Sequence, residues 1–272
     1  MGDFHGKFPI KLKNKIKKED YDYILCNGDF ANTDLIRKYI FKYWTSKNWW
    51  EIIGIKKAKQ IEKESFDSGL KIIKSLNSLG KKVYLVWGNA DFYKDFLTGK
   101  EKVLSPGVYE NKIKKLKNII LIERKKIRLN NIDIVGYGGY VDATEFIKHP
   151  IDKNKKSQKN RLKKYKEYEN ELKNLFLKNK PSKNFIFLTH FTPYKILDKI
   201  KLKSSPMNGK HIGWEPYNKI IKKYKPKYCI CGHMHENPGK AKLYQTTVIN
   251  PGLASESKAV ILDLNKNKIK FL

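Results

Sequence analysis

The stretch YDYILCNGDF (residues 21–30) has the form that decides the fold, an apolar run that ends in a Gly-Asp pair. Such a run, closed by a turn signal, predicts a buried β-strand whose carboxyl end carries the polar pair. The same form occurs again in KKVYLVWGNAD (81–91), KNFIFLTHFTP (183–193) and PKYCICGHMHE (226–236). Because ligand sites of open α/β sheets gather at the carboxyl ends of strands, these four loops are predicted to meet at one site.

The segments between these strands supply helices and further strands. Helical patterns near 34–79 and 155–180 are interpreted as helical insertions. Residues 119–140 are interpreted as short antiparallel strands, and 259–272 as a closing β-hairpin. No internal repeat or linker is visible, so residues 1–272 are predicted to form a single α/β domain.

The net charge of +31, from 58 Lys and Arg against 27 Asp and Glu, favours an anionic partner. The inference is modest, because Lys is accompanied by abundant Ile and Asn, a bias that A-rich codons produce across a whole proteome. No apolar run approaches the roughly 20 residues of a membrane span, so no membrane partner is expected. The first residues lack the apolar stretch of a signal peptide, and a cytoplasmic protein is expected. The three cysteines are interpreted as buried free thiols of a reducing compartment.

Polar side chains at the strand ends and near the N-terminus form a mixed set of carboxylate, amide and imidazole groups. They are Asp3, His5, Asp29, Asn89, His190, His233 and His235. Each alone has a structural explanation, since Asp and Asn after Gly form turns and a single histidine is usually a structural one. Their joint occurrence is harder to dismiss, because the set takes four of the chain's six histidines.

In order, these residues spell D-x-H, G-D, G-N, H and G-H-x-H, from residue 3 to residue 235. The series resembles that of the calcineurin-like metallophosphoesterases, and residues 211–236 followed by INPG (249–252) are similar to the phosphodiesterase-like branch. The resemblance implies a four-layer α/β/β/α sandwich of two mixed β-sheets flanked by helices. It also implies a dinuclear metal site that activates water for in-line attack, and therefore a phosphodiesterase or phosphatase.

The resemblance divides the ligands between two divalent metal ions. The residues that would hold the first ion are Asp3, His5, Asp29 and His235. The residues that would hold the second, with one carboxylate shared, are Asp29, Asn89, His190 and His233. Mixed oxygen and nitrogen ligands suit Mn²⁺, the first expectation, and also Fe²⁺, Ni²⁺ or Zn²⁺. The expected partner is a phosphoester substrate, with a nucleotide or nucleic acid among the possibilities.

Two features depart from the family pattern. Many members read G-N-H-[DE], where this chain has Ala90 and then Asp91. Asp91 and His211 are therefore the candidates for the catalytic general acid, although either could instead be structural. The second departure is the start, because only two residues precede Asp3 and the first strand of the family is truncated. If that start is genuine, Asp3 and His5 are expected on a mobile terminus and the first metal is expected to bind weakly.

Two other functions stay open. The same fold serves elsewhere as a binding module, so the chain could be a catalytically weak or inactive scaffold, although retention of all the ligand types argues against it. Alternatively the lysines bind nucleic acid, in which case affinity falls steeply with salt whether or not metal is present.

Overall fold

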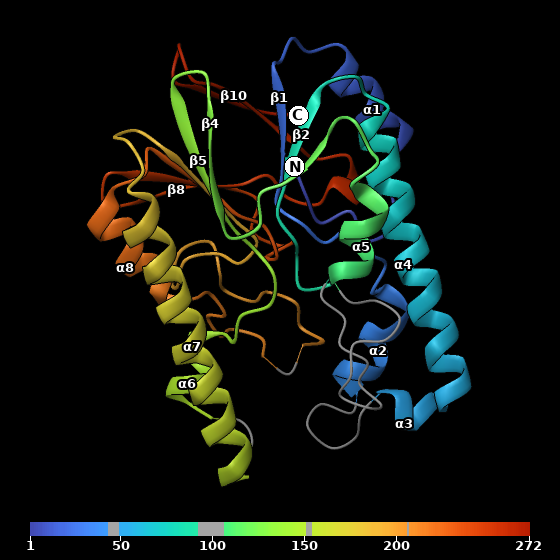
Figure 1. Ribbon diagram of the computed structural model, residues 1–272. Helices are drawn as coiled ribbons and strands as arrows, with labels where there is room; N and C mark the ends of the chain where they lie inside the picture. Colours follow the sequence, from blue (N-terminus) through green and yellow to red (C-terminus); the bar gives the residue numbers. More distant parts are fainter. Residues whose placement is uncertain (43–48, 92–105, 151–153, 206) are drawn as a thin grey trace.

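The computed structural model describes residues 1–42, 49–91, 106–150, 154–205 and 207–272, and its strands form two facing sheets (Figure 1). The first sheet is made of three parallel strands, β1 (Tyr23–Cys26), β2 (Lys82–Leu85) and β3 (Ile119–Leu121). The second sheet contains, in spatial order, β4 (Lys125–Leu129), β5 (Ile132–Tyr137), β6 (Ile186–Thr189), β7 (Tyr228–Ile230), β9 (Thr246–Asn250) and β8 (Gly239–Leu243). A hairpin of β10 (Val260–Asp263) and β11 (Lys268–Phe271) stands beside them.

Helices cover the outer face of each sheet and complete four layers (Figure 1). Helices α1 (Ile10–Lys17) and α4 (Ile55–Asn77) pack on the three-stranded sheet. Helices α7 (Lys155–Asn179) and α8 (Glu215–Tyr224) pack on the six-stranded sheet. A third apolar cluster, which includes Val86, Leu188 and Ile249, lies between the sheets. The observed architecture is the expected four-layer sandwich of two sheets flanked by helices.

The remaining helices are short and lie along the connections. They are α2 (Asp34–Lys42), α3 (Trp49–Ile53), α5 (Pro106–Ile113), α6 (Thr144–Lys148) and the 3₁₀ turn η1 (Ala254–Glu256). Within the described ranges, no helix combines the length and apolar character that crossing a bilayer requires.

The structure confirms some of the predictions for individual helices and strands and corrects one of them. The hairpin predicted over 259–272 is confirmed by the pairing of β10 with β11. Helices α2, α3 and α4 occupy the region near 34–79, of which residues 43–48 lie outside the described ranges, and α7 occupies that near 155–180. The prediction for 119–140 is partly wrong, because β4 and β5 are antiparallel whereas β3 pairs in parallel with β2 in the other sheet.

The N-terminal residues are held against the end of β1. The Met1 ammonium group donates to the Leu25 carbonyl at 2.9 Å, and Gly2 forms a single parallel bridge with Leu253. Asp3 and His5 are buried, at 1% and 3% exposure, and their backbone N–H groups donate to the loop at 28–29. The expectation that both sit on a mobile terminus is therefore wrong.

Candidate metal centre

The candidate ligands come from both sheets and converge where the carboxyl ends of the parallel strands face each other. Asp29 follows β1 and Asn89 follows β2, while His190 comes directly after β6. His233 and His235 follow β7, the strand next to β6 in the six-stranded sheet. Strand direction alone brings these loops together, as expected for a site at the carboxyl edge of an α/β sheet.

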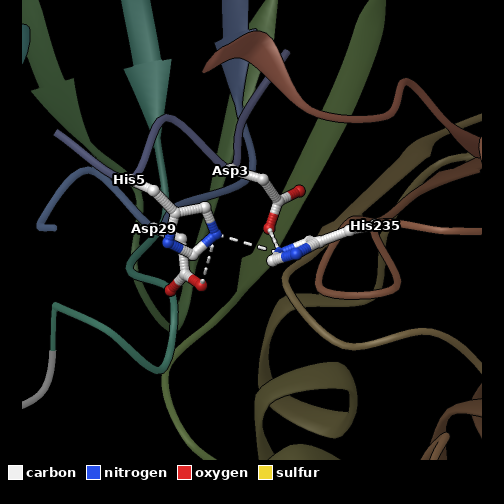
Figure 2. Close-up of side chains that lie close together, drawn as sticks. All are labelled: Asp3, His5, Asp29 and His235. Atoms are coloured by element: carbon white, nitrogen blue, oxygen red, sulfur yellow. Dashed lines mark hydrogen bonds and ion pairs between the residues drawn. The ribbon is translucent and has the colours of Figure 1, made fainter. Parts of the chain in front are cut away.

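A first group joins the N-terminal segment to the loop after β7 (Figure 2). The Nε2 atoms of His5 and His235 lie 2.9 Å apart. The Nε2 atom of His5 lies 3.8 Å from Oδ2 of Asp29, and that of His235 lies 3.4 Å from Oδ1 of Asp3. One donor atom from each of these four residues lies within 4.8 Å of the others, close enough to hold one ion.

A second group shares Asp29 with the first. It contains Asp29, His190 and His233, and the Nε2 atom of His190 lies 3.5 Å from Oδ1 of Asp29. Asn89 completes the group, because its Oδ1 atom lies 2.8 Å from Nε2 of His190 and 2.7 Å from Nδ1 of His233. Two ligand groups that share one carboxylate are what a dinuclear site requires.

The tautomer of His190 favours a bound cation. Its Nδ1 atom lies 2.8 Å from the carbonyl oxygen of Asn27, which can only accept, so Nδ1 carries the hydrogen. The Nε2 atom then presents a lone pair to the Asn89 oxygen at 2.8 Å. A cation between two such lone pairs stabilises an arrangement that is otherwise repulsive, so the residues present fit a divalent metal ion.

Burial sets the protonation of the imidazoles. It lowers the pKa of His5 to about 4 and holds that of His233 well below its usual value, so both rings are neutral near pH 7 and their lone pairs are available. Burial also lowers the pKa of His235, but contact with the Asp3 carboxylate outweighs it and the net pKa is raised. For Asp3, burial raises the pKa, but the His235 contact outweighs it and keeps the group a carboxylate.

Four of the candidate ligands have a left-handed backbone conformation. The φ angles of Asp3, His5, Asp29 and His233 are +55°, +43°, +56° and +66°, a region that residues other than glycine rarely adopt. Each such residue costs on the order of 1 kcal/mol or more and persists because its surroundings hold it. The loops of the site therefore hold these four ligands in a conformation that they would otherwise avoid.

The glycines of the motifs allow the loops to touch. A Cβ atom on Gly28, whose φ is +94°, would overlap the backbone of Gly88. A Cβ atom on Gly88 would overlap Asp29, and one on Gly232 would overlap the Asp3 carboxylate. The glycine before each polar residue in G-D, G-N and G-H is therefore needed for close approach.

The sequence suggested Asp91 as a general acid, but its carboxylate is directed at backbone N–H groups and not at the metal ligands. It is fully buried, and its Oδ2 atom accepts from the backbone N–H groups of Asp29 and Gly88 at 2.8 and 2.9 Å. Its Oδ1 atom accepts from those of Phe30 and Ala31 at 2.9 and 3.1 Å. Burial and the neighbouring Asp29 carboxylate raise the pKa of Asp91 to about 7, against the effect of these donors. Asp91 positions the loop that carries Asp29.

His211, the other candidate acid, is also not brought to the metal ligands. Its Nδ1 atom lies 2.6 Å from Oδ1 of buried Asp198, whose Oδ2 atom accepts from the backbone N–H groups of Lys195 and Gly213. Among the described residues that line the cavity beside the metal ligands, His211 does not occur. The structure therefore does not support His211 as a general acid. Instead, the His211 side chain holds the loop before α8 to Asp198.

Two residues of the site were not predicted from the sequence. Phe191 stacks on His233, with ring centroids 3.9 Å apart and planes at 28°, and the Oγ1 atom of Thr33 lies 3.3 Å from Nδ1 of His5. Phe191 follows the candidate ligand His190 directly, a position that a strand-end motif could have drawn attention to. Thr33 carries no comparable signal.

Adding Mn²⁺ to metal-free protein is expected to raise the midpoint of thermal unfolding. An ion that binds the folded cluster at 100 times its Kd contributes about 2.7 kcal/mol, or about 5 °C for a chain of this size. His5→Ala should reduce this shift, whereas His149→Ala, at an exposed position after α6, should keep it. Differential scanning calorimetry measures the shift, and an equal shift in both variants would place the ion elsewhere.

Comparisons with known proteins agree with this geometry. A family model described as calcineurin-like phosphoesterase matches residues 1–237. An uncharacterized protein of Methanocaldococcus jannaschii is 27% identical over 155 residues, which are 54% of this chain and 59% of that protein, so the match spans less than two thirds of the relative. A solved crystal structure covers 100% of this chain and 96% of its own, with a TM-score of 0.67 and 21% identity. The crystal structure of phosphopantetheinyl hydrolase from Mycobacterium tuberculosis covers 100% and 94%, with a TM-score of 0.52 and 11% identity. At these identities both structures show the shared fold alone.

Proposed function

The chain belongs to the calcineurin-like phosphoesterase family, and from that premise we propose that it is a metal-dependent hydrolase of phosphodiesters or phosphomonoesters. The observation that carries the proposal is the pair of ligand groups joined at Asp29. A family match alone would also describe an inactive relative. A shared carboxylate, the neutral imidazoles of His5 and His233, and strained ligand backbones together are costly to maintain unless metal binds.

The proposed roles follow from the side chains. Asp3, His5, Asp29 and His235 would hold one ion, and Asp29, Asn89, His190 and His233 the other. When bound, two divalent ions lower the pKa of water and neutralise charge on the phosphoryl oxygens. Phe191, stacked on His233, fixes the orientation of that ring. The hydrogen bond from Ala90 N–H to Oδ1 of Asp29, at 2.7 Å, holds the shared carboxylate.

The residue at position 90 cannot donate a proton to the leaving group, because it is an alanine. Ala90 lines the cavity where many members of the family are expected to have a histidine, and Asp91 points away from it. The rate should therefore depend strongly on the leaving group, with p-nitrophenolate favoured over alkoxides. We propose Mn²⁺ as the physiological metal, on the mixed oxygen and nitrogen ligands.

We further propose a reducing compartment, the cytoplasm, for this protein. All three cysteines are buried free thiols, and burial raises the pKa of Cys26 and Cys229 to about 12. Thiols of this kind are structural and unreactive.

The test is hydrolysis of bis-p-nitrophenyl phosphate by protein stripped of metal and then given Mn²⁺, Fe²⁺, Ni²⁺ or Zn²⁺ separately. Turnover is expected only after an ion is added, and excess chelator should abolish it. Absence of turnover with every ion, in protein whose circular dichroism shows it folded, would favour an inactive scaffold. Metal-independent binding of nucleic acid with a steep salt dependence would favour the lysine-driven alternative.

A further inference from the structure

A cavity of about 1010 Å³ extends from the metal ligands His5, Asp29 and His233 to helix α7. A volume of this order accommodates one small molecule, since ligand pockets span about 300–1000 Å³. The metal ligands form only part of the lining, so the rest of the cavity is available to the remainder of the substrate. The chemistry of its walls therefore describes the parts of the substrate that are not hydrolysed.

One wall is apolar. Ile200, Met207 and Met234 form a buried cluster against which Phe146 and Ile212 pack, and all five line the cavity. Methionine side chains adapt to irregular ligand shapes and make favourable contacts with aromatic rings. This wall suits an apolar or aromatic part of a ligand.

An aromatic ring stands at the side of the same cavity. Tyr140 is 46% exposed, although its hydroxyl group donates to Oδ1 of Asp142 at 2.9 Å. Arg161 binds the same oxygen at 2.9 Å, and the Tyr140 ring meets Phe191 edge to face, with centroids 6.2 Å apart. A large ring that is ordered by polar contacts and still exposed offers a surface on which a flat group can stack.

Helix α7 contributes a polar and cationic wall. Its C-terminal half packs on the six-stranded sheet through Leu172 and Phe176, whereas its N-terminal half extends past the ends of the strands (Figure 1). The cavity-lining side chains of that half recur every three or four residues and so share one face. They are Lys156, Ser157, Asn160, Arg161, Lys164 and Tyr168.

Two of these cations are available to a ligand. Arg161 forms an ion pair with Asp142, which offsets its charge. Lys156 and Lys164 are exposed at the cavity, and no carboxylate of the described residues forms an ion pair with either of them. Two ammonium groups beside a site that holds a phosphoester provide a place for a second anionic group.

We propose that the substrate is a nucleotide-sized phosphodiester with a flat ring and a second anionic group. The ring lies against Tyr140 and the apolar wall, and the second anion binds Lys156 and Lys164. This inference rests on the proposed function of the same site. In the reaction, water adds to phosphorus and loses a proton to solvent, and the ester P–O bond breaks with its electron pair going to the leaving oxygen. A leaving alkoxide takes a proton back from solvent, whereas p-nitrophenolate leaves as the anion.

The anionic subsite is tested with thymidine 5′-(p-nitrophenyl phosphate), with and without a 3′-phosphate. The 3′-phosphate is expected to lower KM about tenfold in the wild-type protein. The K156A/K164A variant should bring the ratio of the two KM values close to one. The K159A/K166A variant, which removes the same charge from α7 residues outside the cavity, should keep the wild-type ratio.

The ring subsite is tested with Tyr140→Ala, with Tyr140→Phe as the variant that keeps the ring. Methyl p-nitrophenyl phosphate serves as the probe without a base, and the thymidine diester should have a KM about tenfold lower. Tyr140→Ala should remove this preference and Tyr140→Phe should retain most of it. Equal loss in both variants would attribute the effect to the Asp142 contact and overturn the stacking role.

The outcomes separate this inference from the proposed function. If bis-p-nitrophenyl phosphate and both thymidine diesters resist hydrolysis with every divalent ion, the proposed function fails, and this inference fails with it. If the diesters are hydrolysed with the same KM, or if both lysine pairs reduce the preference equally, only this inference is overturned. In the latter case the lysines act through overall charge.

Discussion

Asp29→Asn is expected to lower the turnover number for bis-p-nitrophenyl phosphate by about a thousandfold, or about 4 kcal/mol in activation free energy. Asp29 is the residue common to both ligand groups, with its Oδ1 atom 3.5 Å from Nε2 of His190 and its Oδ2 atom 3.8 Å from Nε2 of His5. The amide has nearly the same shape, but it removes a negative charge and replaces one ligand oxygen with an N–H donor. Neither group would then keep its shared anionic ligand.

The measurement combines turnover with metal content, since the physical cause is loss of ion binding. Elemental analysis after dialysis should find less metal in Asp29→Asn than in the wild-type protein, and circular dichroism should find both folded. Asp67→Asn, at an exposed ion pair on α4, removes the same charge outside the two ligand groups and should retain metal and activity. Activity above about a tenth of the wild-type level in Asp29→Asn would argue against a shared carboxylate.

Much of the fold could be predicted because its central strands carry a strong local signal. Every residue of β6 (Ile186–Thr189) is buried, and a strand that is covered on both faces has an uninterrupted apolar sequence. The three-residue strand β3 (Ile119–Leu121) carries too little pattern to indicate its partner. Its pairing with β2 depends on the packing of α4 and the other sheet, which no local sequence records.

The candidate ligands were easier to predict than the residues around them. Ligands such as Asp29 and His233 stand beside glycines at strand ends, a position that sequence reveals. The direction of a side chain is not revealed, and for this reason Asp91 was interpreted as an acid although it faces backbone N–H groups about 60 residues earlier. The lysines of α7 likewise resemble any solvated helix face until the fold places Lys156 and Lys164 beside the cavity.

Asp91→Ala is expected to destabilise the fold by about 3–5 kcal/mol, the range for the loss of a buried hydrogen-bond network. The substitution would leave the N–H groups of Asp29, Phe30, Ala31 and Gly88 without their acceptor in a region closed to water. These groups belong to the loops after β1 and β2, so the loss should also loosen the metal ligands. A surface carboxylate such as Asp20, changed to Ala, should alter stability by less than about 0.5 kcal/mol.

Urea denaturation, followed by circular dichroism with and without Mn²⁺, measures the effect of Asp91→Ala. A structural role predicts a lower midpoint of unfolding, together with weaker metal binding and slower hydrolysis of every ester, whatever its leaving group. A general acid would give the opposite pattern, because it would leave the unfolding midpoint and metal binding nearly unchanged and slow only esters with poor leaving groups. Since the four hydrogen bonds that Asp91 forms with the described residues all come from backbone donors, we expect the first pattern, in which Asp91 acts on catalysis by holding Asp29 in place.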